Sequence, residues 1–252
     1  MEPEKNKKKR QSIVSVLVVS ICLLLGIGGL SFYAYSNYQQ DHFDKVTETV
    51  QSKALDEMKK KEKIITSNSK ENTIEIAGST TDNSSTNNLS IDRKKVDYSG
   101  KSVKTLTLDD MEKVNPKKVV SSFGVGRIEI ADIALFLPIL EGVSQENLSV
   151  GAGTMKANQS LGRGNFALAG HYMTDAGLLF GGIKNVTVGS GIYVTYYSDM
   201  AYYTVTEVKH ITKHDGDVVL DSQGEGILTL ITCDSSIDGT AGRYMVRAKL
   251  VQ

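Results

Sequence analysis

One cysteine in this chain has the surroundings of a nucleophile. Cys233 ends the strand-like run Leu228–Cys233, and Asp234 follows it, so its thiol falls where a strand meets solvent. The other cysteine of the chain, Cys22, lies in an apolar N-terminal run and offers no evident disulfide partner. A lone thiol in such a place is either a packed, inert residue or a nucleophile, and a nucleophile needs a base or a cation beside it.

His171 is the histidine best placed to be that base. It closes the run Asn165–His171, whose alternation puts Ala169 and His171 on one face of a strand, as it puts Ile231 and Cys233 on one face of another. Of the other histidines, His42 lies in a charged N-terminal segment. His210 is expected at a solvated strand end, and His214 in the loop beyond it.

Arg243 supplies a candidate for anion stabilisation. It begins the last strand-like run, and its fork of donors with permanent charge suits an oxyanion better than lysine does. We therefore expect a groove floored by Ala169 and Ile231, with the cysteine, the histidine and the arginine around it. The residues alone leave the alternative open that all three are structural, with Arg243 an edge-strand charge.

Short runs rich in β-branched and aromatic residues must position these side chains. They are divided by Gly, Ser, Asn and Asp, and they predict a mainly β fold, an eight-stranded closed or nearly closed barrel with short helices. A helix is expected from Thr107, and a hairpin turn at Ser198–Asp199. The expected strands are Val119–Phe123, Gly126–Ile133, Ala134–Leu140, Asn165–Tyr172, Ile192–Tyr197, Ala201–Ile211, Ile227–Cys233 and Arg243–Val251.

The N-terminus reads as a membrane anchor. A basic tail, residues 1–11, precedes an uncharged apolar run, residues 12–35, and a span needs roughly 20 such residues. The basic cluster should stay cytoplasmic, which puts the rest of the chain outside. A cleaved signal peptide is the competing interpretation, but the apolar run is long for one and Ala34–Ser36 is a poor cleavage site.

Residues 36–94 are expected to be a stalk and a flexible linker. Apolar residues at spacings of three and four over residues 36–65 predict a helix, which we expect to be solvated. Residues 66–92 are dominated by Ser, Thr, Asn, Asp and Lys and cannot bury enough apolar surface to fold. The folded domain should occupy residues 95–252. A net charge of zero gives no case for a nucleic-acid partner.

Several motifs in register resemble the sortase family. Leu228–Cys233, read LTLITC, resembles its TLxTC signature, Asn165–His171 is similar to the strand with the family histidine, and Arg243 sits where the family places its arginine. The resemblance covers about residues 115–252. The N-terminal anchor fits class A of Gram-positive bacteria. The sequence shows neither the C-terminal apolar tail nor the lid motif of pilin-type sortases, and it leaves no room for the extra helix of class B. Further matches lie at Gly126–Ile130, Leu137–Ile139 and Gly151–Thr154.

The resemblance implies a cysteine transpeptidase. Such enzymes cleave an LPxTG sorting signal between Thr and Gly and join the surface protein to an amine of a lipid II-type peptidoglycan precursor at the cell membrane. Cys233 would form the thioacyl-enzyme, His171 would move the protons and Arg243 would bind substrate or oxyanion. The implied substrate-binding residues are Ala169, Ile231 and Thr232. A pilin-type sortase and a non-catalytic, membrane-anchored β-barrel binding module remain alternatives.

The resemblance also bears on calcium. Some class A members bind calcium through acidic residues ahead of the histidine strand and in the loop before the cysteine strand. The matching positions here are Lys156, Gln159, Arg163 and Ser222, of which none is a carboxylate and two are cations. We therefore expect no metal site, no cofactor and calcium-independent activity.

Overall fold

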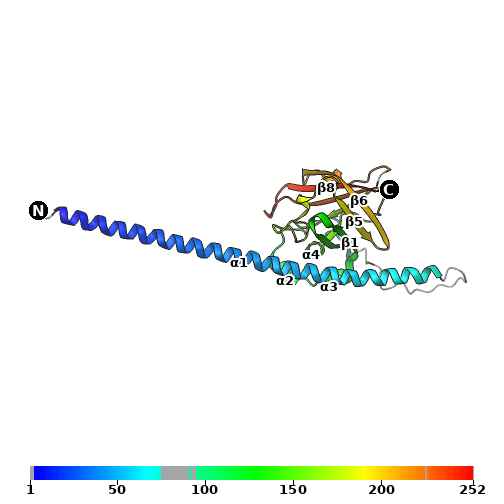
Figure 1. Cartoon of the computed structure of the whole chain (residues 1–252), viewed down its shortest axis with the longest axis horizontal. Coiled ribbons are helices and arrows are strands. Elements are labelled where there is room, and N and C mark those ends of the chain that lie inside the picture. Colours follow the sequence, from blue (N-terminus) through cyan, green and yellow to red (C-terminus); the bar gives the residue numbers. More distant parts are fainter. Residues whose placement is uncertain (1–2, 75–90, 92–94, 225, 252) are drawn as a thin grey trace. The chain divides into compact units, whose positions relative to one another are not determined.

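The computed structural model describes residues 3–74, 91, 95–224 and 226–251 (Figure 1). The chain forms two compact units, Met1–Lys45 and Val46–Gln252. Helix α1 (Pro3–Ile74) makes up the first unit and continues into the second. By length and composition, this is the helix among the described residues that could cross a membrane, with a mean hydropathy of 2.2 over its apolar window.

The second unit is built on a closed barrel, which confirms the predicted fold. Its strand order is β1-β2-β3-β4-β7-β8-β6-β5, and neighbours pair antiparallel except for the parallel pairs β2–β3 and β4–β7. The strands are β1 (Gly124–Ile130), β2 (Leu135–Leu140), β3 (Ala152–Thr154), β4 (Asn165–Ala169), β5 (Gly191–Tyr196), β6 (Asp199–Thr212), β7 (Ile227–Cys233) and β8 (Gly242–Leu250).

The barrel core follows from alternation along the strands. Phe166 and Leu168 on β4, and Leu228 and Leu230 on β7, are fully buried, so these strands turn one face to the interior. The Phe166 ring meets Tyr196 from β5 edge-on, with ring centroids 4.9 Å apart. The residues that alternate with them along the strands, including Ala169 and Ile231, therefore lie on the opposite face.

Short helices cap the barrel. They are α2 (Leu108–Lys113), α3 (Pro116–Phe123), α4 (Gln145–Val150) and the 3₁₀ turns η3 (Ala131–Ile133), η4 (Ile183–Asn185) and η5 (Gly216–Val219). The predicted helix start at Thr107 is confirmed, since its side chain accepts a hydrogen bond from the backbone N–H of Asp110 in a capping box.

Two strand assignments from sequence are wrong. Val119–Phe123 is helical in α3, because Asn115 caps the helix N-terminus and Pro116 occupies its first turn. The eighth strand is instead β3, whose three residues are too few to show a pattern. The hairpin turn also differs by one position, since Tyr196 pairs with Asp199 and leaves Tyr197 and Ser198 in the turn.

The helix expected over residues 36–65 is present, but it is not solvated throughout. From Val46 onward it belongs to the compact unit that holds the barrel, and Val50, Ala54 and Met58 are buried there. The predicted linker lies mostly outside the described residues, while residues 66–74 continue the helix. The proposed boundary between residues 94 and 95 stays an expectation.

Candidate active site

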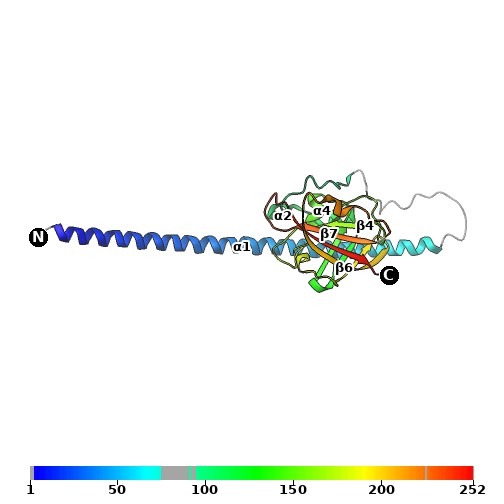
Figure 2. The same cartoon turned by 90° about the horizontal axis from the view of Figure 1, so that it is seen from above.

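Strands β4, β7 and β8 bring the three candidate residues to one end of the barrel. Cys233, the last residue of β7, pairs directly with Arg243 at the start of β8. The parallel pair β4–β7 matches Ala169 with Ile231, and Figure 2 shows these two strands side by side. The same register continues past β4, because Gly170 N–H donates to the Ile231 carbonyl at 3.1 Å. The strand expected over Asn165–Tyr172 is shorter than predicted, since β4 ends at Ala169, and His171 lies two residues beyond its end.

His171 lies in a desolvated position. Its side chain is buried, and its Nε2 has no hydrogen-bond partner within the described part of the chain. Burial lowers the pKa of His171 to about 4, an effect that the nearby carboxylate of Asp110 opposes. The backbone carbonyl of His171 accepts a hydrogen bond from Phe180 N–H at 3.1 Å. The imidazole is therefore neutral near pH 7, with no competing hydrogen bond at Nε2 from the described residues.

Cys233 is half-buried and carries its proton at rest. Burial raises the pKa of the Cys233 thiol above its ordinary value, while the positive charge of Arg243 lowers it and the negative charge of Asp234 raises it further. Together with the low pKa of His171, this makes the resting pair a neutral thiol and a neutral imidazole. The sequence had left that protonation state open.

Arg243 is held by the backbone of the turn that precedes it. Its Nη1 donates to the carbonyls of Thr240 at 2.8 Å and Gly242 at 2.7 Å. Asp234 accepts from the Thr240 hydroxyl at 3.1 Å, and a Cβ at Gly242 would collide with its carboxylate, so this close turn requires glycine. One nitrogen thus anchors the guanidinium, while its remaining N–H groups make no hydrogen bond within the described structure.

The face beside these residues is small and apolar. Ala169 and Ile231 are half-buried neighbours on it, as predicted, with Met245 of β8 paired to Ile231 and buried. We call Ala169, Ile231, Cys233 and Arg243 the catalytic face. Thr232 does not reach it, because its side chain points to the other side of β7, is buried, and donates to the Gly170 carbonyl at 2.8 Å. Thr232 therefore joins β7 to the residue before His171.

Comparison with known proteins assigns the chain to a family. Residues 128–251 match the profile of the sortase domain. Over 127 residues the chain is 42% identical to Sortase A of Bacillus anthracis, and the match covers 50% of this chain and 60% of that protein. Over 97 residues it is 39% identical to the putative sortase YwpE of Bacillus subtilis, covering 38% of this chain and 93% of that one. The chain belongs to the sortase family.

The family assignment confirms the resemblance seen in the motifs, and the Sortase A relatives agree with class A. Sortase A of Listeria monocytogenes, known as a crystal structure, is 36% identical; the match covers 51% of this chain and 88% of that one, with a TM-score of 0.49. The chain spans about 60% of the length of the B. anthracis relative.

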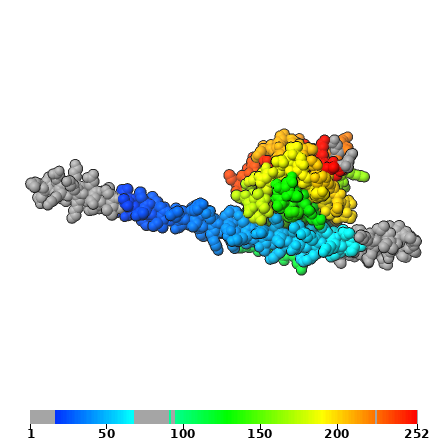
Figure 3. Space-filling model, viewed as in Figure 1, coloured from blue at the N-terminus to red at the C-terminus, as the bar shows by residue number. Residues whose placement is uncertain are grey.

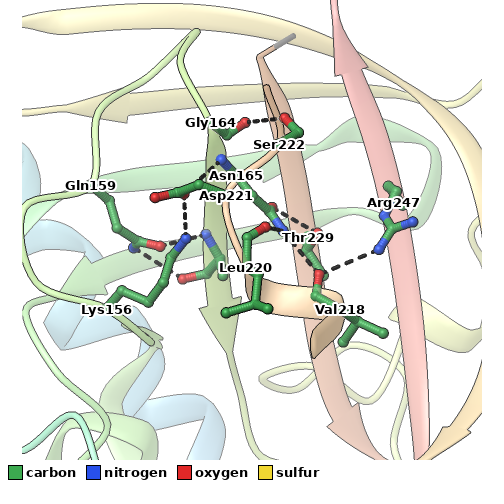
Figure 4. Close-up of polar contacts among 11 residues, drawn as sticks. Lys156, Gln159, Gly164, Asn165, Val218, Leu220, Asp221, Ser222, Thr229 and Arg247 are labelled. Atoms are coloured by element: carbon green, nitrogen blue, oxygen red, sulfur yellow. Dashed lines mark hydrogen bonds and ion pairs between the residues drawn. The ribbon is translucent and has the colours of Figure 1, made fainter. Parts of the chain in front are cut away.

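A polar network fixes the loop that leads into the cysteine strand of this sortase (Figure 4). The side-chain amide of Asn165, at the start of β4, donates to the carbonyls of Val218 at 2.9 Å and Leu220 at 3.2 Å. Its Oδ1 accepts from the Thr229 hydroxyl at 2.8 Å, and Arg247 Nη2 donates to Val218 at 3.3 Å. Sequence reasoning named Asn165 only as part of a motif, because its partners lie more than 50 residues away.

The positions that matched calcium ligands hold a different set of contacts. Lys156 Nζ lies 2.6 Å from Asp221 Oδ1, in the same loop as Val218, and its hydrogen bond lowers the pKa of Asp221. Gln159 bonds both backbone groups of Ala167, and Ser222 donates to Gly164, while Arg163 is exposed. Within the described residues, no group of three or more His, Cys, Asp or Glu side chains could hold a metal ion.

Proposed function

We propose that this sortase is a cysteine transpeptidase that cleaves an LPxTG-type signal between Thr and Gly and joins the surface protein to a peptidoglycan amine. The observation that carries the proposal is the direct pairing of Cys233 with Arg243, with His171 two residues beyond the end of β4, which pairs with the cysteine strand. Nucleophile and anion-stabilising group are thereby held on adjacent strands, and the proton carrier directly follows the strand beside them.

In the first half-reaction, the Cys233 thiol gives its proton to neutral His171 as its sulfur attacks the threonine carbonyl. The resulting oxyanion accepts hydrogen bonds from the N–H groups of Arg243 that the turn leaves free. Collapse breaks the C–N bond, and the imidazolium gives its proton to the leaving glycine amine. A thioester between Cys233 and the threonine remains.

The second half-reaction runs the same chemistry in reverse. An acceptor amine gives a proton to His171 as it attacks the thioester, and the new amide forms when the Cys233 sulfur leaves. The imidazolium then returns its proton to the sulfur, which restores the neutral pair. Because burial disfavours a charged imidazole, His171 gives up its proton readily in both halves.

The partners follow from this reaction and from the N-terminal helix. We infer that the donors are surface proteins bearing the LPxTG motif and that the acceptor is a lipid II-type peptidoglycan precursor. The apolar part of α1 supports a single-pass anchor in the cell membrane. The basic residues ahead of it favour a cytoplasmic N-terminus and an extracellular barrel.

We also propose that activity needs no calcium. The ammonium of Lys156 lies against Asp221, where it joins the segment ahead of β4 to the loop between β6 and β7. A cation is thus already built into the position that matches a calcium site, and it would repel a divalent ion. Chelator should leave turnover unchanged; loss of turnover restored by added calcium would overturn this part of the proposal.

A fluorogenic LPxTG peptide tests the reaction with the detergent-solubilised full chain. Wild type should cleave the peptide, and an added amine should appear in the product by mass spectrometry. Cys233→Ala should abolish both, while Cys22→Ala, the matched control in the apolar helix, should leave both intact. Absence of cleavage by wild type would overturn the proposed reaction, and cleavage that survives Cys233→Ala would show that the thiol is not the nucleophile.

A further inference from the structure

The second half of helix α1 has a continuous buried stripe. Its buried residues recur at spacings of three, four and seven, which places them on one face of the helix: Thr47, Val50, Ala54, Met58 and Ile65. The neighbouring side chain of Ile64 points away and is 53% exposed. We call residues 46–67 of α1 the docking segment. All of it lies in the compact unit that contains the barrel.

The docking segment contacts the barrel at the junction of α3 and β1. Lys61 Nζ donates to the carbonyls of Val120 at 3.1 Å and Ser121 at 2.9 Å, near the C-terminal end of α3, where a cation is favoured. Gly124 leaves room for the helix, since a Cβ there would lie 2.9 Å from the Met58 sulfur. In the space-filling view the segment lies directly against the barrel (Figure 3).

An ion-pair chain adds specificity to this contact. Arg127 of β1 is paired both with Glu62 of the docking segment and with Glu129 of its own strand. All three side chains are largely shielded from water, with exposed fractions of 12–31%. Removing one partner would leave a half-buried charge without compensation, so the pair selects for one arrangement of helix and barrel.

A second contact reaches the loop that follows the candidate histidine. Gln51 Oε1 accepts from Leu179 N–H at 2.9 Å, and its Nε2 donates to the Gly177 carbonyl at 3.4 Å. Leu179 has a φ of 42°, which is unfavourable for leucine and needs such support. The next residue, Phe180, donates to the His171 carbonyl. The docking segment is thereby linked to the backbone of His171.

The barrel topology keeps the docked helix clear of the cysteine strand. In the closed order β1-β2-β3-β4-β7-β8-β6-β5, β7 lies four strands from β1 in either direction. A helix seated on β1 therefore lies across the barrel from the strand that carries Cys233 (Figure 1). The catalytic face stays open to a protein substrate.

We propose that the docking segment is a strut that packs against the barrel at α3 and β1 and supports the loop after His171. The occupant of the β1–α3 surface is this chain itself. The barrel is consequently held by residues 46–67 of the same chain. That the strut serves the anchoring of surface proteins rests on the proposed function, but the docking of the helix on the barrel does not.

Cysteine accessibility tests the strut without any measurement of turnover. In the full chain in nanodiscs, carrying Cys22→Ala, we compare maleimide labelling of Ala54→Cys with that of Ile64→Cys, each read by mass spectrometry of its own peptide. Ala54 is fully buried, so its labelling should be about 100-fold slower, because it requires the helix to undock. Met58→Cys, also fully buried, replaces Ala54→Cys should that variant fail to fold.

Charge reversal supplies the matched comparison. Arg127→Glu should speed labelling of Ala54→Cys towards the Ile64→Cys rate, and Glu62→Arg added to it should restore protection. Equal rates at positions 54 and 64 in the parent chain, or no effect of Arg127→Glu, would overturn the proposal. Protection that disappears on dilution would also overturn it, since the occupant would then be a second copy.

Discussion

Cys233 and Arg243 face each other as a directly paired couple across β7 and β8. Residues paired in this way have Cα atoms about 5 Å apart, so the distance from thiol to guanidinium is set by the sheet itself. The turn between them, tied by Asp234 and Thr240 and closed by Gly242, fixes the arginine from the other side. The arrangement is preorganised for charge that develops next to the sulfur.

Arg243→Ala should lower kcat/KM for the LPxTG peptide by about 100-fold or more, the size of effect seen when an oxyanion donor is lost. Arg243→Lys should recover little of it, because a lysine cannot both bond the Thr240 and Gly242 carbonyls and direct further donors to the substrate. Arg163→Ala, an exposed site, is the control. A near-normal rate for Arg243→Lys would indicate that charge alone suffices.

The resting thiol should be protonated at neutral pH. Burial of both side chains raises the pKa of Cys233 and lowers that of His171, so the neutral pair predominates between the two values. The thiolate absorbance of wild type, measured against Cys233→Ala, should therefore be absent at neutral pH and appear only in alkali. A full thiolate signal at neutral pH would instead show a resting ion pair.

Acid should destabilise the fold through His171. A histidine with a folded pKa of about 4 and an unfolded value of 6.5 stabilises the protein fully above pH 6.5, and this contribution is lost as the pH falls to about 4. The shift corresponds to about 3 kcal/mol of unfolding free energy. Denaturant unfolding across this range should show the loss in wild type and in His214→Gln, an exposed control, but not in His171→Gln.

Whether a feature could be predicted from the sequence depends on how far apart in the chain the interacting residues lie. The candidate triad and the pair Ala169–Ile231 were predictable, because motif order and two-residue alternation act within single strands. Alternation also points Thr232 away from Cys233, and its hydroxyl donates to the Gly170 carbonyl; its role in substrate binding stays a prediction. The stripe at Val50, Ala54 and Met58 was visible too, but spacing alone cannot say whether water or protein covers a helix face.

Contacts between distant segments were out of reach for the same reason. The sequence around Asn165 does not predict that its side-chain amide binds a loop more than 50 residues later. The sequence around Asp110 likewise does not predict that its carboxylate lies near His171. The three residues of β3 were lost because parallel pairing with β2, and not their own pattern, makes them a strand. The helix at Val119–Phe123 was lost because β-branched residues outweighed the Asn115–Pro116 start signal.

The loop ahead of β7 offers a last test, at Lys156. Its ion pair with Asp221 is largely exposed on the aspartate side, so its loss should cost at most about 1 kcal/mol of stability, with the Asn165 contacts still in place. Lys156→Glu should nevertheless raise KM for the peptide several-fold, since two carboxylates would repel each other and displace the loop that leads into the cysteine strand. Because paired carboxylates are calcium ligands, millimolar calcium should lower that KM again. Lys101→Glu, an exposed lysine far along the chain from this loop, should change neither KM nor the response to calcium. An unchanged KM in Lys156→Glu would mean that the contacts of Asn165, Arg247 and Ser222 hold the loop without the ion pair.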